Sequence, residues 1–404
     1  MINPLIIDSN YCIVNNAAGQ ISRTFWEHVD RTILAPTILC GSLNPQLHLN
    51  SSLININERT WIRKCIGAIR KMGIPDFYYL PDTNRFAWCP QAYDTIVSIP
   101  YSFDYVHSIS NPRSTHLLAK RLKEKMGIPW IAQLDDPWHD TSGRDYKFNH
   151  FSEYDLRLEG EVANNADLII HSNEVVRDIW KERYGDAVAD KMVIMPFNIN
   201  IYDLPEVRPI PSNSKLELSH IGHIYNTRSA MTVFRALEIL KRDNPEIANK
   251  LHFTFIGGIH EREKQYVQKS SISELVTFIP TLSPEELEFY YQRSNFFLVI
   301  DINILRSPNY PSKLMMYYYY RRPILGITNP GSQLYKELKE TNNTCFFYGE
   351  VNELASMLKD AVLHYDKYLR FDNNRWKKHT VENVQNEYLN LLSTRLGFKI
   401  EEDE

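Results

Sequence analysis

A glycine and an arginine in the second half of the 404-residue chain have the types and spacing of an anion site. Gly222 follows a predicted buried strand, and Arg228 stands just before a helix predicted over 229–241. A glycine lets the backbone turn tightly, and the N-terminus of a helix offers free N–H groups to an anion. The arginine adds a planar, permanently charged group that fits phosphate oxygens. A purely structural turn is the alternative.

A lysine further along the chain strengthens the phosphate interpretation. Lys313 lies in the first turn of another predicted helix, where its charge opposes the helix macrodipole and so needs a reason. A bound diphosphate would supply one, whereas an ordinary solvated lysine is the alternative. Because Arg228 and Lys313 stand at neighbouring loop ends, we expect them to neutralise a diphosphate jointly. Gly258 ends the next predicted strand and permits another close approach of a ligand to the backbone.

Two adjacent carboxylates, Asp135 and Asp136, and a histidine follow a predicted strand of the first half, within the segment 135–140. A positioned carboxylate or imidazole can orient a substrate hydroxyl or assist its deprotonation. Asp136 and His139 are therefore the candidates for this role. Acidic residues at a strand end are also common loop caps, which is the structural alternative.

The elements that must position these residues are short β-type runs alternating with longer helical ones. In the first half, helices are predicted near Ser22 and over 114–126 and 154–166, and strands over 5–7, 37–40, 93–98, 105–108, 129–133, 168–172 and 192–195. The alternation then restarts, with strands over 216–221, 251–256, 276–279, 296–301 and 324–327, and helices over 229–241, 261–269, 284–293, 313–320, 333–340, 351–365 and 375–396. This order is typical of α/β proteins with parallel sheets.

We therefore predict two doubly wound, Rossmann-like domains, over 1–203 and 215–374. The segment 204–214 carries three prolines and no periodicity, as expected of a linker. The last segment, 375–404, is predicted to return to the first domain. Ligands of such sheets bind beyond the carboxyl ends of the strands, and the cleft between the two domains is the expected site.

The amino-acid composition limits the class of protein to which this chain can belong. The 43% hydrophobic and 23% charged residues are typical of a globular protein, and the formal charge of −4 offers no overall attraction for nucleic acid. Five scattered cysteines, with no C-x-x-C pair, favour reduced thiols and argue against a structural zinc site. Neither a secretory leader nor a membrane-spanning stretch is recognisable. A cytoplasmic location is therefore predicted.

One basic segment suggests contact with an anionic membrane. Residues 58–71 carry five positive charges and one negative, and their apolar residues fall on one helical stripe: Trp61, Ile62, Cys65, Ile66 and Ile69. Such a helix can lie on the inner face of the cell membrane. A core-facing helix with a solvated basic face is the alternative.

Several segments, in the right order, resemble glycosyltransferase family four, the group 1 glycosyl transferases. In the second half these are Gly222 to Ser229, Phe255-Ile-Gly-Gly258, 276–287 and Asn309-Tyr-Pro-Ser-Lys-Leu314, followed by Arg322-Pro-Ile-Leu325. Upstream, 127–138 and Ala166-Asp-Leu-Ile-Ile-His-Ser172 are similar to two further family segments. The resemblance implies a GT-B fold, a nucleoside-diphosphate sugar as donor, no cofactor or essential metal, and retention of anomeric configuration.

Carried over by position, the resemblance places Gly222, Arg228 and Lys313 at the diphosphate, which is the leaving group of the transfer, so their charges would stabilise it as it forms. The base would be read by backbone groups around Ile279 and Thr281, and Gly19 would approach the phosphates from the first domain. The complete predicted donor set is Gly19, Gly222, Tyr225, Arg228, Gly258, Ile279, Thr281, Asp301, Pro311, Ser312 and Lys313.

The chain also departs from the family pattern. Pro308 and Met316 occupy the positions of its two glutamates, the second of which binds the ribose. Asp301 and Asn309 are the candidates to replace it. In the first half Asp135 stands in place of a family arginine, whereas Asp136 keeps the family's aspartate, so we assign Asp136 to positioning the acceptor.

The function predicted from the sequence is a metal-independent, retaining hexosyltransferase that moves a sugar to a glycan or lipid-linked acceptor, as in bacterial surface-polysaccharide synthesis. Two alternatives remain open. A nucleotide-sugar epimerase shares the GT-B architecture, and loss of both glutamates is compatible with a non-catalytic partner subunit.

Overall fold

The computed structural model describes residues 1–13, 16–41, 47, 49–71, 80–139, 149–209, 212, 214–225 and 227–400. They form two compact units, one of Met1–Asn200 with Thr380–Glu404 and one of Ile201–His379. The chain thus leaves the first unit after Asn200 and re-enters it at Thr380.

The described residues of the segment expected to be a linker are packed against other residues of the protein. It belongs to the second unit, where Arg322 Nη2 donates to Arg208 O (3.0 Å) and Gln292 Nε2 donates to Glu206 O (2.8 Å). Its prolines exclude a helix or a strand, but they do not exclude side-chain bonds to its carbonyl groups.

In the first unit, seven described strands form one parallel sheet in the order β3-β2-β1-β4-β5-β6-β7. The strands are β1 (Pro4–Ile7), β2 (Thr37–Cys40), β3 (Ser52–Asn55), β4 (Tyr105–Ile109), β5 (Trp130–Leu134), β6 (Leu168–His171) and β7 (Met192–Ile194). The helices are α1 (Ala17–Trp26), α2 (Thr60–Lys71), α3 (Asn84–Ala87), α4 (Cys89–Ser98), α5 (Ser114–Met126), α6 (Asn149–Asn165), α7 (Glu174–Tyr184), α8 (Asp186–Ala189) and α16 (Val381–Leu396).

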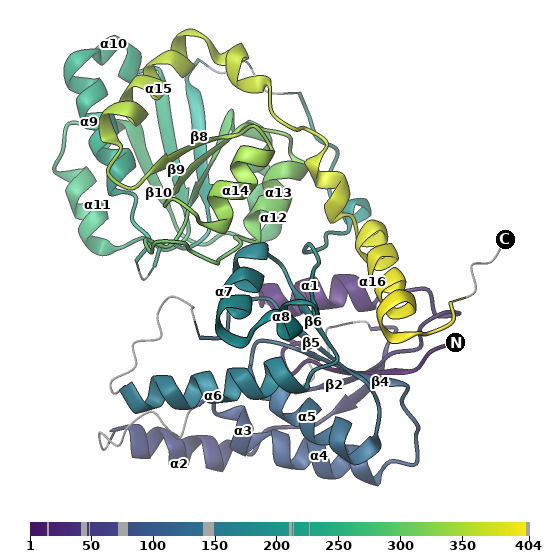
Figure 1. The fold of residues 1–404 in the computed structure, drawn as a ribbon. Coiled ribbons are helices and arrows are strands. Elements are labelled where there is room, and N and C mark those ends of the chain that lie inside the picture. Colours follow the sequence, from purple (N-terminus) through teal and green to yellow (C-terminus); the bar gives the residue numbers. More distant parts are fainter. Residues whose placement is uncertain are drawn as a thin grey trace. The chain divides into compact units, whose positions relative to one another are not determined.

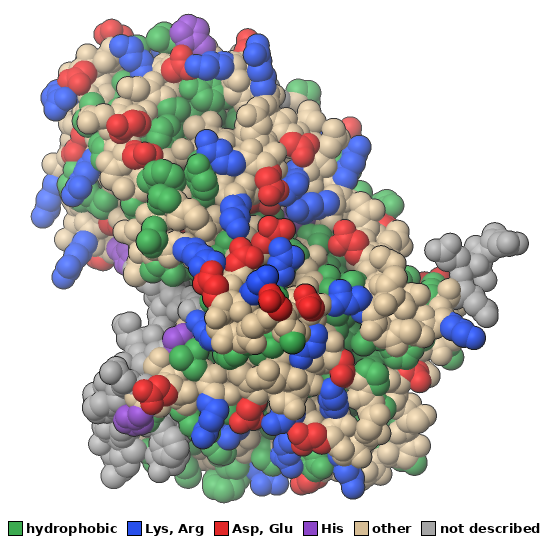
Figure 2. All heavy atoms as spheres, in the orientation of Figure 1, with side chains coloured by type: hydrophobic (Ala, Val, Ile, Leu, Met, Phe, Trp, Pro, Cys, Tyr) green, Lys and Arg blue, Asp and Glu red, His purple; other side chains and the backbone are tan. Residues whose placement is uncertain are grey.

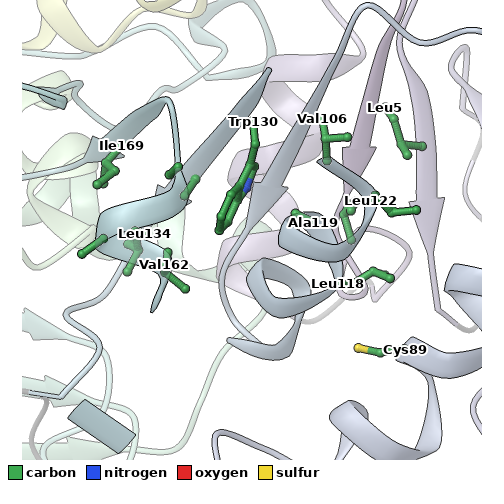
Figure 3. Packing of buried hydrophobic residues seen from close by; sticks show 14 of the residues in the cluster. Leu5, Cys89, Val106, Leu118, Ala119, Leu122, Trp130, Leu134, Val162 and Ile169 are labelled. Carbon is green, nitrogen blue, oxygen red and sulfur yellow. The ribbon is translucent and has the colours of Figure 1, made fainter. Parts of the chain in front are cut away.

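Both faces of this sheet are covered. On one face, Trp130 of β5 and strand residues such as Leu5 and Val106 pack against Leu118 and Leu122 of α5 (Figure 3). Their neighbours in the same strands, among them Ile6 and Ile131, point to the opposite face and pack against α1 and α16. Alternation along each strand therefore divides the core into two layers. The C-terminal helix α16 completes the second layer and lies beside α1 (Figure 1).

The second unit repeats the plan with six described strands, in the order β10-β9-β8-β11-β12-β13, again all parallel. The strands are β8 (Leu216–Ile221), β9 (Leu251–Ile256), β10 (Val276–Ile279), β11 (Phe296–Ile300), β12 (Ile324–Thr328) and β13 (Thr344–Phe347). Helices α9 (Met231–Asp243), α10 (Pro245–Ala248), α11 (Glu261–Gln268) and α15 (Val351–Leu363) cover one face, and α12 (Pro284–Arg293), α13 (Lys313–Tyr319) and α14 (Gln333–Glu340) the other (Figure 1). Four 3₁₀ turns, Ile201–Asp203, Ser273–Leu275, Tyr365–Leu369 and Arg375–His379, are also described.

Several expected elements differ from the structure. Residues 93–98, expected as a strand, belong to helix α4, which has Pro90 in its first turn and buries Ala92 and Ile96 four residues apart on one face. The strands β3 and β13 were not predicted; their residues are mostly half-buried or exposed, so neither shows the continuous apolar run of a central strand.

The predicted starts of two helices were also wrong. Helix α1 begins at Ala17, ahead of Ser22, because the Asn16 side chain accepts a hydrogen bond from Gly19 N (2.8 Å) and caps the helix there. The final helix begins at Val381, behind a cap in which Thr380 Oγ1 accepts from Asn383 N, and residues 375–379 form a separate 3₁₀ turn.

The surface agrees with the small net charge. On the face drawn in Figure 2, acidic and basic side chains are interspersed. No helix among the described residues is both long and apolar enough to span a bilayer.

The turns after β8 and β9 are where the second unit most needs glycine. Gly222 and Gly257 both have positive φ, +117° and +110°, and a Cβ at Gly257 would lie 2.9 Å from the carbonyl carbon of Gly222. We predict that Gly257→Ala lowers the urea midpoint of unfolding, with a loss of about 1–3 kcal/mol from overpacking added to the backbone strain. Gly349→Ala is the matched control, because Gly349 has φ +94° and open space around its Cβ position. Equal losses in both variants would show that the close approach contributes nothing.

Candidate functional site

The strand order identifies the place where the second unit should bind a ligand. From β8 the chain winds outward to β9 and β10, and from β11 it winds the other way to β12 and β13. Open parallel sheets bind ligands beyond the carboxyl ends of the strands at this switch point. Gly222 directly follows β8 and Asp301 directly follows β11.

Gly222 and Lys313, which are far apart in sequence, meet at this switch point. A Cβ at Gly222 would lie 2.9 Å from Lys313 Nζ and 3.3 Å from its Cε, so the glycine leaves the room that the lysine side chain occupies. The lysine begins α13, and Tyr317 on the next turn of α13 ties that helix to β8, because Ile221 N donates to the Tyr317 hydroxyl (3.0 Å). The position of Lys313 is therefore set by the end of β8.

His220, the next-to-last residue of β8, accepts a hydrogen bond from this lysine. Its Nδ1 lies 3.0 Å from Leu298 O and its Nε2 lies 3.1 Å from Lys313 Nζ. The carbonyl group can only accept, so Nδ1–H donates to it, and Nε2 is left with the lone pair that accepts from the ammonium. Burial, and then the charge of Lys313, lower the pKa of His220 well below its ordinary value, which agrees with a neutral ring.

The site carries two positive groups, and neither forms an ion pair with an acidic side chain among the described residues, although the charge of Arg228 lowers the pKa of the nearby Asp301. Burial, reinforced by the charge of Arg228, lowers the pKa of Lys313 to about 7. Arg228 Nη1 is buried and has no hydrogen-bond partner in the described part of the chain, while the guanidinium lies 4.8 Å from the ring centroid of Tyr225. Two cations that repel each other in a half-buried position favour the binding of an anion.

Asp301 is fully buried, and its carboxylate forms hydrogen bonds with three neighbouring residues. It accepts hydrogen bonds from Ile302 N (2.7 Å), Ser307 Oγ (3.1 Å) and Thr328 Oγ1 (3.1 Å). Burial raises its pKa to about 6, against the opposing effect of these bonds. These bonds indicate that Asp301 holds together the loop after β11.

Asn309 is the better placed of the two candidates for the missing ribose ligand. Its Oδ1 is buried without a hydrogen-bond partner among the described residues, whereas its backbone N donates to Ser307 Oγ (3.4 Å). Met316, at the family glutamate position, is half-buried on α13.

The remaining predicted donor residues surround the switch point. Gly258 N donates to His223 Nδ1 (2.8 Å), and Gly258 lines an open pocket of about 410 Å³ together with Tyr225, which is half exposed. The carbonyl of Ile279 already accepts from Gly257 N (2.9 Å), and Thr281 is exposed. Pro311 and Ser312, both half-buried, precede α13, and the Ser312 hydroxyl makes no capping bond to it.

Gly19 has a structural explanation within the first unit. It lies inside α1, its N–H is taken by the Asn16 cap, and a Cβ there would overlap the carbonyl oxygen of Asn10. The glycine therefore allows α1 to approach the loop after β1.

The two candidates from the first unit lie just beyond β5. Asp136 is exposed, and its Oδ2 accepts from Asn111 Nδ2 (3.1 Å). His139 is half-buried: its Nε2 lies 2.7 Å from Ser152 Oγ of α6, and its backbone N donates to Glu159 Oε2 (2.9 Å). Asp136 is thus available at the surface, whereas the His139 ring is joined to a helix. Asp140 lies outside the described residues.

The basic helix α2 divides its apolar stripe between the core and the surface. Ile66 is buried, whereas Trp61 is 62% exposed and Cys65 is exposed as well. Part of the apolar stripe is therefore exposed at the surface of the first unit. Over the described ranges, no three His, Cys, Asp or Glu side chains gather as metal ligands would.

Comparisons with known proteins give the class of this architecture. The chain matches no protein-family model. It is similar to the alpha-monoglucosyldiacylglycerol synthase of Streptococcus pneumoniae, at 20% identity over 316 residues, which are 73% of this chain and 66% of that protein. The chain thus spans just under two thirds of that relative's length.

Solved structures are similar over nearly the whole chain. Anabaena HepE in complex with UDP-glucose aligns at 13% identity with a TM-score of 0.66, over 98% of this chain and 100% of that one. Sucrose-phosphate synthase of Thermosynechococcus elongatus aligns at 11% identity with a TM-score of 0.69, over 98% and 99%. The lipopolysaccharide outer core galactosyltransferase WaaB aligns at 12% identity with a TM-score of 0.63, over 98% and 100%. The chain therefore has the GT-B fold of these glycosyltransferases, as the sequence predicted.

Two residues of this site were missed by sequence reasoning. His220 lies within a predicted strand, where a polar residue gives no sign of its partner, and Tyr317 is one of four consecutive tyrosines. Only the register of β8 against β11, and of α13 over both, brings them to Lys313.

The depressed pKa of Lys313 predicts a cost in stability. Because an ordinary lysine holds its proton up to about pH 10.5, the unfolded chain binds more protons than the native one between about pH 7 and 10.5. The unfavourable contribution of Lys313 to the free energy of unfolding therefore becomes smaller as pH rises from about 7 to 10.5. Lys313→Met should raise Tm at pH 6–7, by roughly 2–4 °C for each kcal/mol, and the gain should shrink towards pH 10. Thermal melts of the exposed-lysine variant Lys250→Met are the control. A gain that does not depend on pH would contradict the assignment.

Proposed function

We propose that this protein is a glycosyltransferase that takes a sugar from a nucleoside-diphosphate sugar and holds the diphosphate at Arg228 and Lys313. The observation that carries the proposal is the pair of half-buried cations at the switch point of the second sheet, neither of which forms an ion pair among the described residues. A diphosphate would satisfy both charges, and it is the group that leaves in such a transfer.

Known structures support a uridine nucleotide as the first donor to test. HepE was crystallised with UDP and with UDP-glucose, and TarM, of the same architecture, with UDP and acceptor sugars. Tyr225, Gly258, Ile279, Thr281, Pro311 and Ser312 are proposed to complete the donor site. The transfer is proposed to retain anomeric configuration, as in glycosyltransferase family four, and to need no metal because side-chain cations hold the leaving group.

The acceptor is proposed to be a glycan or a lipid-linked sugar. The name of the S. pneumoniae relative, alpha-monoglucosyldiacylglycerol synthase, indicates a glycosylated lipid product. The exposed part of the apolar stripe of α2, with its basic neighbours, would suit a protein that works in the cytoplasm at the inner face of the membrane. Asp136 is the proposed positioning group for the acceptor hydroxyl, and His139 is the second candidate.

Nucleotide affinity tests the donor site. Arg228→Ala and Lys313→Ala should each weaken UDP binding by about 1.5–3 kcal/mol, the usual contribution of a hydrogen bond to a charged group. Isothermal titration calorimetry gives the change, and Arg262→Ala, which removes an exposed cation from the same unit, is the matched control. Unchanged affinity in both site variants would overturn the assignment of the diphosphate.

Turnover tests the acceptor side. Asp136→Asn should keep the affinity for UDP but lower the transfer rate by about 10²–10⁴, because an amide accepts the proton of a hydroxyl poorly. Product analysis should be run on EDTA-treated protein, where transfer is expected to persist. Normal turnover in the variant would make Asp136 a loop cap, and transfer that stops with EDTA and returns with manganese would contradict the metal-independent proposal. Nucleotide binding without transfer would favour a non-catalytic subunit.

A further inference from the structure

A continuous chain of hydrogen bonds crosses the core of the first unit, from the C-terminal helix to the turn after β5. Tyr105 and Tyr388 join their hydroxyls at 2.9 Å, and the Tyr388 hydroxyl lies 2.8 Å from His107 Nδ1. His107 Nε2 lies 3.0 Å from Gln133 Oε1, and Gln133 Nε2 donates to Asp135 Oδ1 at 3.1 Å. The chain thus ends next to Asp136.

The chemistry of the groups gives every bond in this chain one direction. The carboxyl oxygen of Asp135 accepts from the Gln133 amide, so Gln133 Oε1 faces His107 and must accept from its Nε2–H. Nδ1 of the ring then accepts a hydrogen bond from the Tyr388 hydroxyl, and the Tyr388 oxygen in turn accepts one from the Tyr105 hydroxyl. Burial lowers the pKa of His107 to about 3, so the ring stays neutral and keeps this tautomer. Reversing one bond would break its neighbours.

Packing keeps Tyr388 in this position. Its ring stands edge-on to Phe25 and Trp26 of α1, at centroid distances of 5.3 and 5.6 Å, and stacks on His107 at 5.5 Å. Tyr105, Tyr388 and His107 are almost completely buried. No water can therefore replace the Tyr388 hydroxyl without a change in the packing of α16 on α1.

The end of the chain is also the point where the turn after β5 is fixed. Asp135 N donates to Ser110 Oγ (3.3 Å), and Ser172 Oγ donates to Asp135 O (3.4 Å). Gln133 provides the bond that holds the Asp135 side chain.

A small cavity of about 20 Å³ adjoins this turn, with room for about one water molecule. It is lined by Asp135, His107 and Tyr388, and by three buried polar atoms without a hydrogen-bond partner in the described chain: Ser22 Oγ, His171 Nε2 and Asn198 Oδ1. The cavity therefore has room for one water beside the chain, with these polar atoms as its hydrogen-bonding partners.

We propose that Tyr388 on the C-terminal helix is a positioning residue, which acts through His107 and Gln133 to fix the Asp135–Asp136 turn and with it the acceptor side of the site. The inference rests on the proposed function, because it concerns where an acceptor hydroxyl would meet Asp136. Tyr388 itself is buried behind the sheet and touches no substrate. Its effect should therefore be on the binding of the acceptor and not on that of the donor.

The experiment compares three variants with the wild-type protein. Tyr388→Phe removes the hydroxyl that donates to His107, and Gln133→Leu removes the last link. Each should raise the acceptor KM about fivefold, the loss expected from one hydrogen bond, with the affinity for UDP unchanged. Tyr105→Phe is the matched control, because it removes an equally buried hydroxyl but leaves Tyr388 able to donate to His107. Its acceptor KM should stay near the wild-type value.

The double variant separates positioning from a general loss of stability. If Tyr388 acts only through Gln133, then Tyr388→Phe with Gln133→Leu should be no worse than either change alone. Additive effects on KM, or an unchanged KM in both single variants, would overturn the proposal. Because Gln133 is only half-buried, Gln133→Leu keeps the test decisive if Tyr388→Phe does not fold.

A second readout does not depend on activity. The carboxyl of Asp135 faces Gln133, Asp136 and Asp8, and burial raises its pKa to about 8. Loss of the Gln133 amide removes a bond that favours the carboxylate, so the ¹³C titration midpoint of Asp135 should move upward in Gln133→Leu and in Tyr388→Phe but not in Tyr105→Phe. Identical midpoints would overturn the proposal. A wild-type protein that transfers no sugar would overturn the proposed function, and this titration would then decide the positioning by itself.

Discussion

The second unit is organised around the repulsion between Arg228 and Lys313. Both side chains are half-buried at the same switch point, and the lysine loses part of its tendency to hold a proton there. Several neighbours make this arrangement possible. Gly222 has no Cβ to occupy the space of the lysine, His220 stays neutral so that it can accept from the ammonium, and Tyr317 fixes the start of α13 to β8. The charge of Arg228 acts on the Asp301 carboxyl, but neither cation forms an ion pair among the described residues. The arrangement therefore lowers stability and favours the binding of an anion.

The first unit shows the opposite electrostatic pattern at the ends of its strands. Burial lowers the pKa of His107, His116 and His171 to about 3 and raises that of Asp135 to about 8, so near neutral pH these groups carry no charge. Hydrogen bonds between neutral partners then hold the turn after β5 in place. Neutral polar groups can bind hydroxyl groups without attracting phosphates, whereas cations such as Arg228 and Lys313 favour an anion. This difference suits the proposed function, in which the second unit would bind the diphosphate of the donor and the first unit the acceptor.

The sequence was sufficient for the fold because both sheets are built from buried, apolar, parallel strands separated by helices. The switch point and its cations were also within reach, since Gly222, Arg228 and Lys313 each conflict locally with what their element prefers. The strand β3 and the helix α4 were missed because an edge strand is only half-buried and because the β-branched residues of 93–98 also suit a helix that buries Ala92 and Ile96. The His220–Lys313 bond and the chain through Tyr388 join residues 93 and 281 positions apart. No local pattern records such pairs, because the register of the strands and the docking of the helices create them.

The departure from glycosyltransferase family four at Pro308 and Met316 would affect only one part of the proposed donor site. The cations and the close turn at Gly222 are present, and they would contact the part of a donor that every nucleoside diphosphate shares. On the proposed ribose side, Pro308 has no donor or acceptor in its side chain and Met316 has only a weakly accepting sulfur. The Asp301 carboxylate already accepts from Ile302 and Ser307 of its own loop and from Thr328 at the end of β12. Asn309 keeps a buried amide oxygen that can accept from a ribose hydroxyl, but an amide binds it less strongly than a charged carboxylate does. Under the proposed function, a larger share of donor affinity would then come from the diphosphate. Because that share depends on the protonation of Lys313, we expect donor binding to be more sensitive to pH as well.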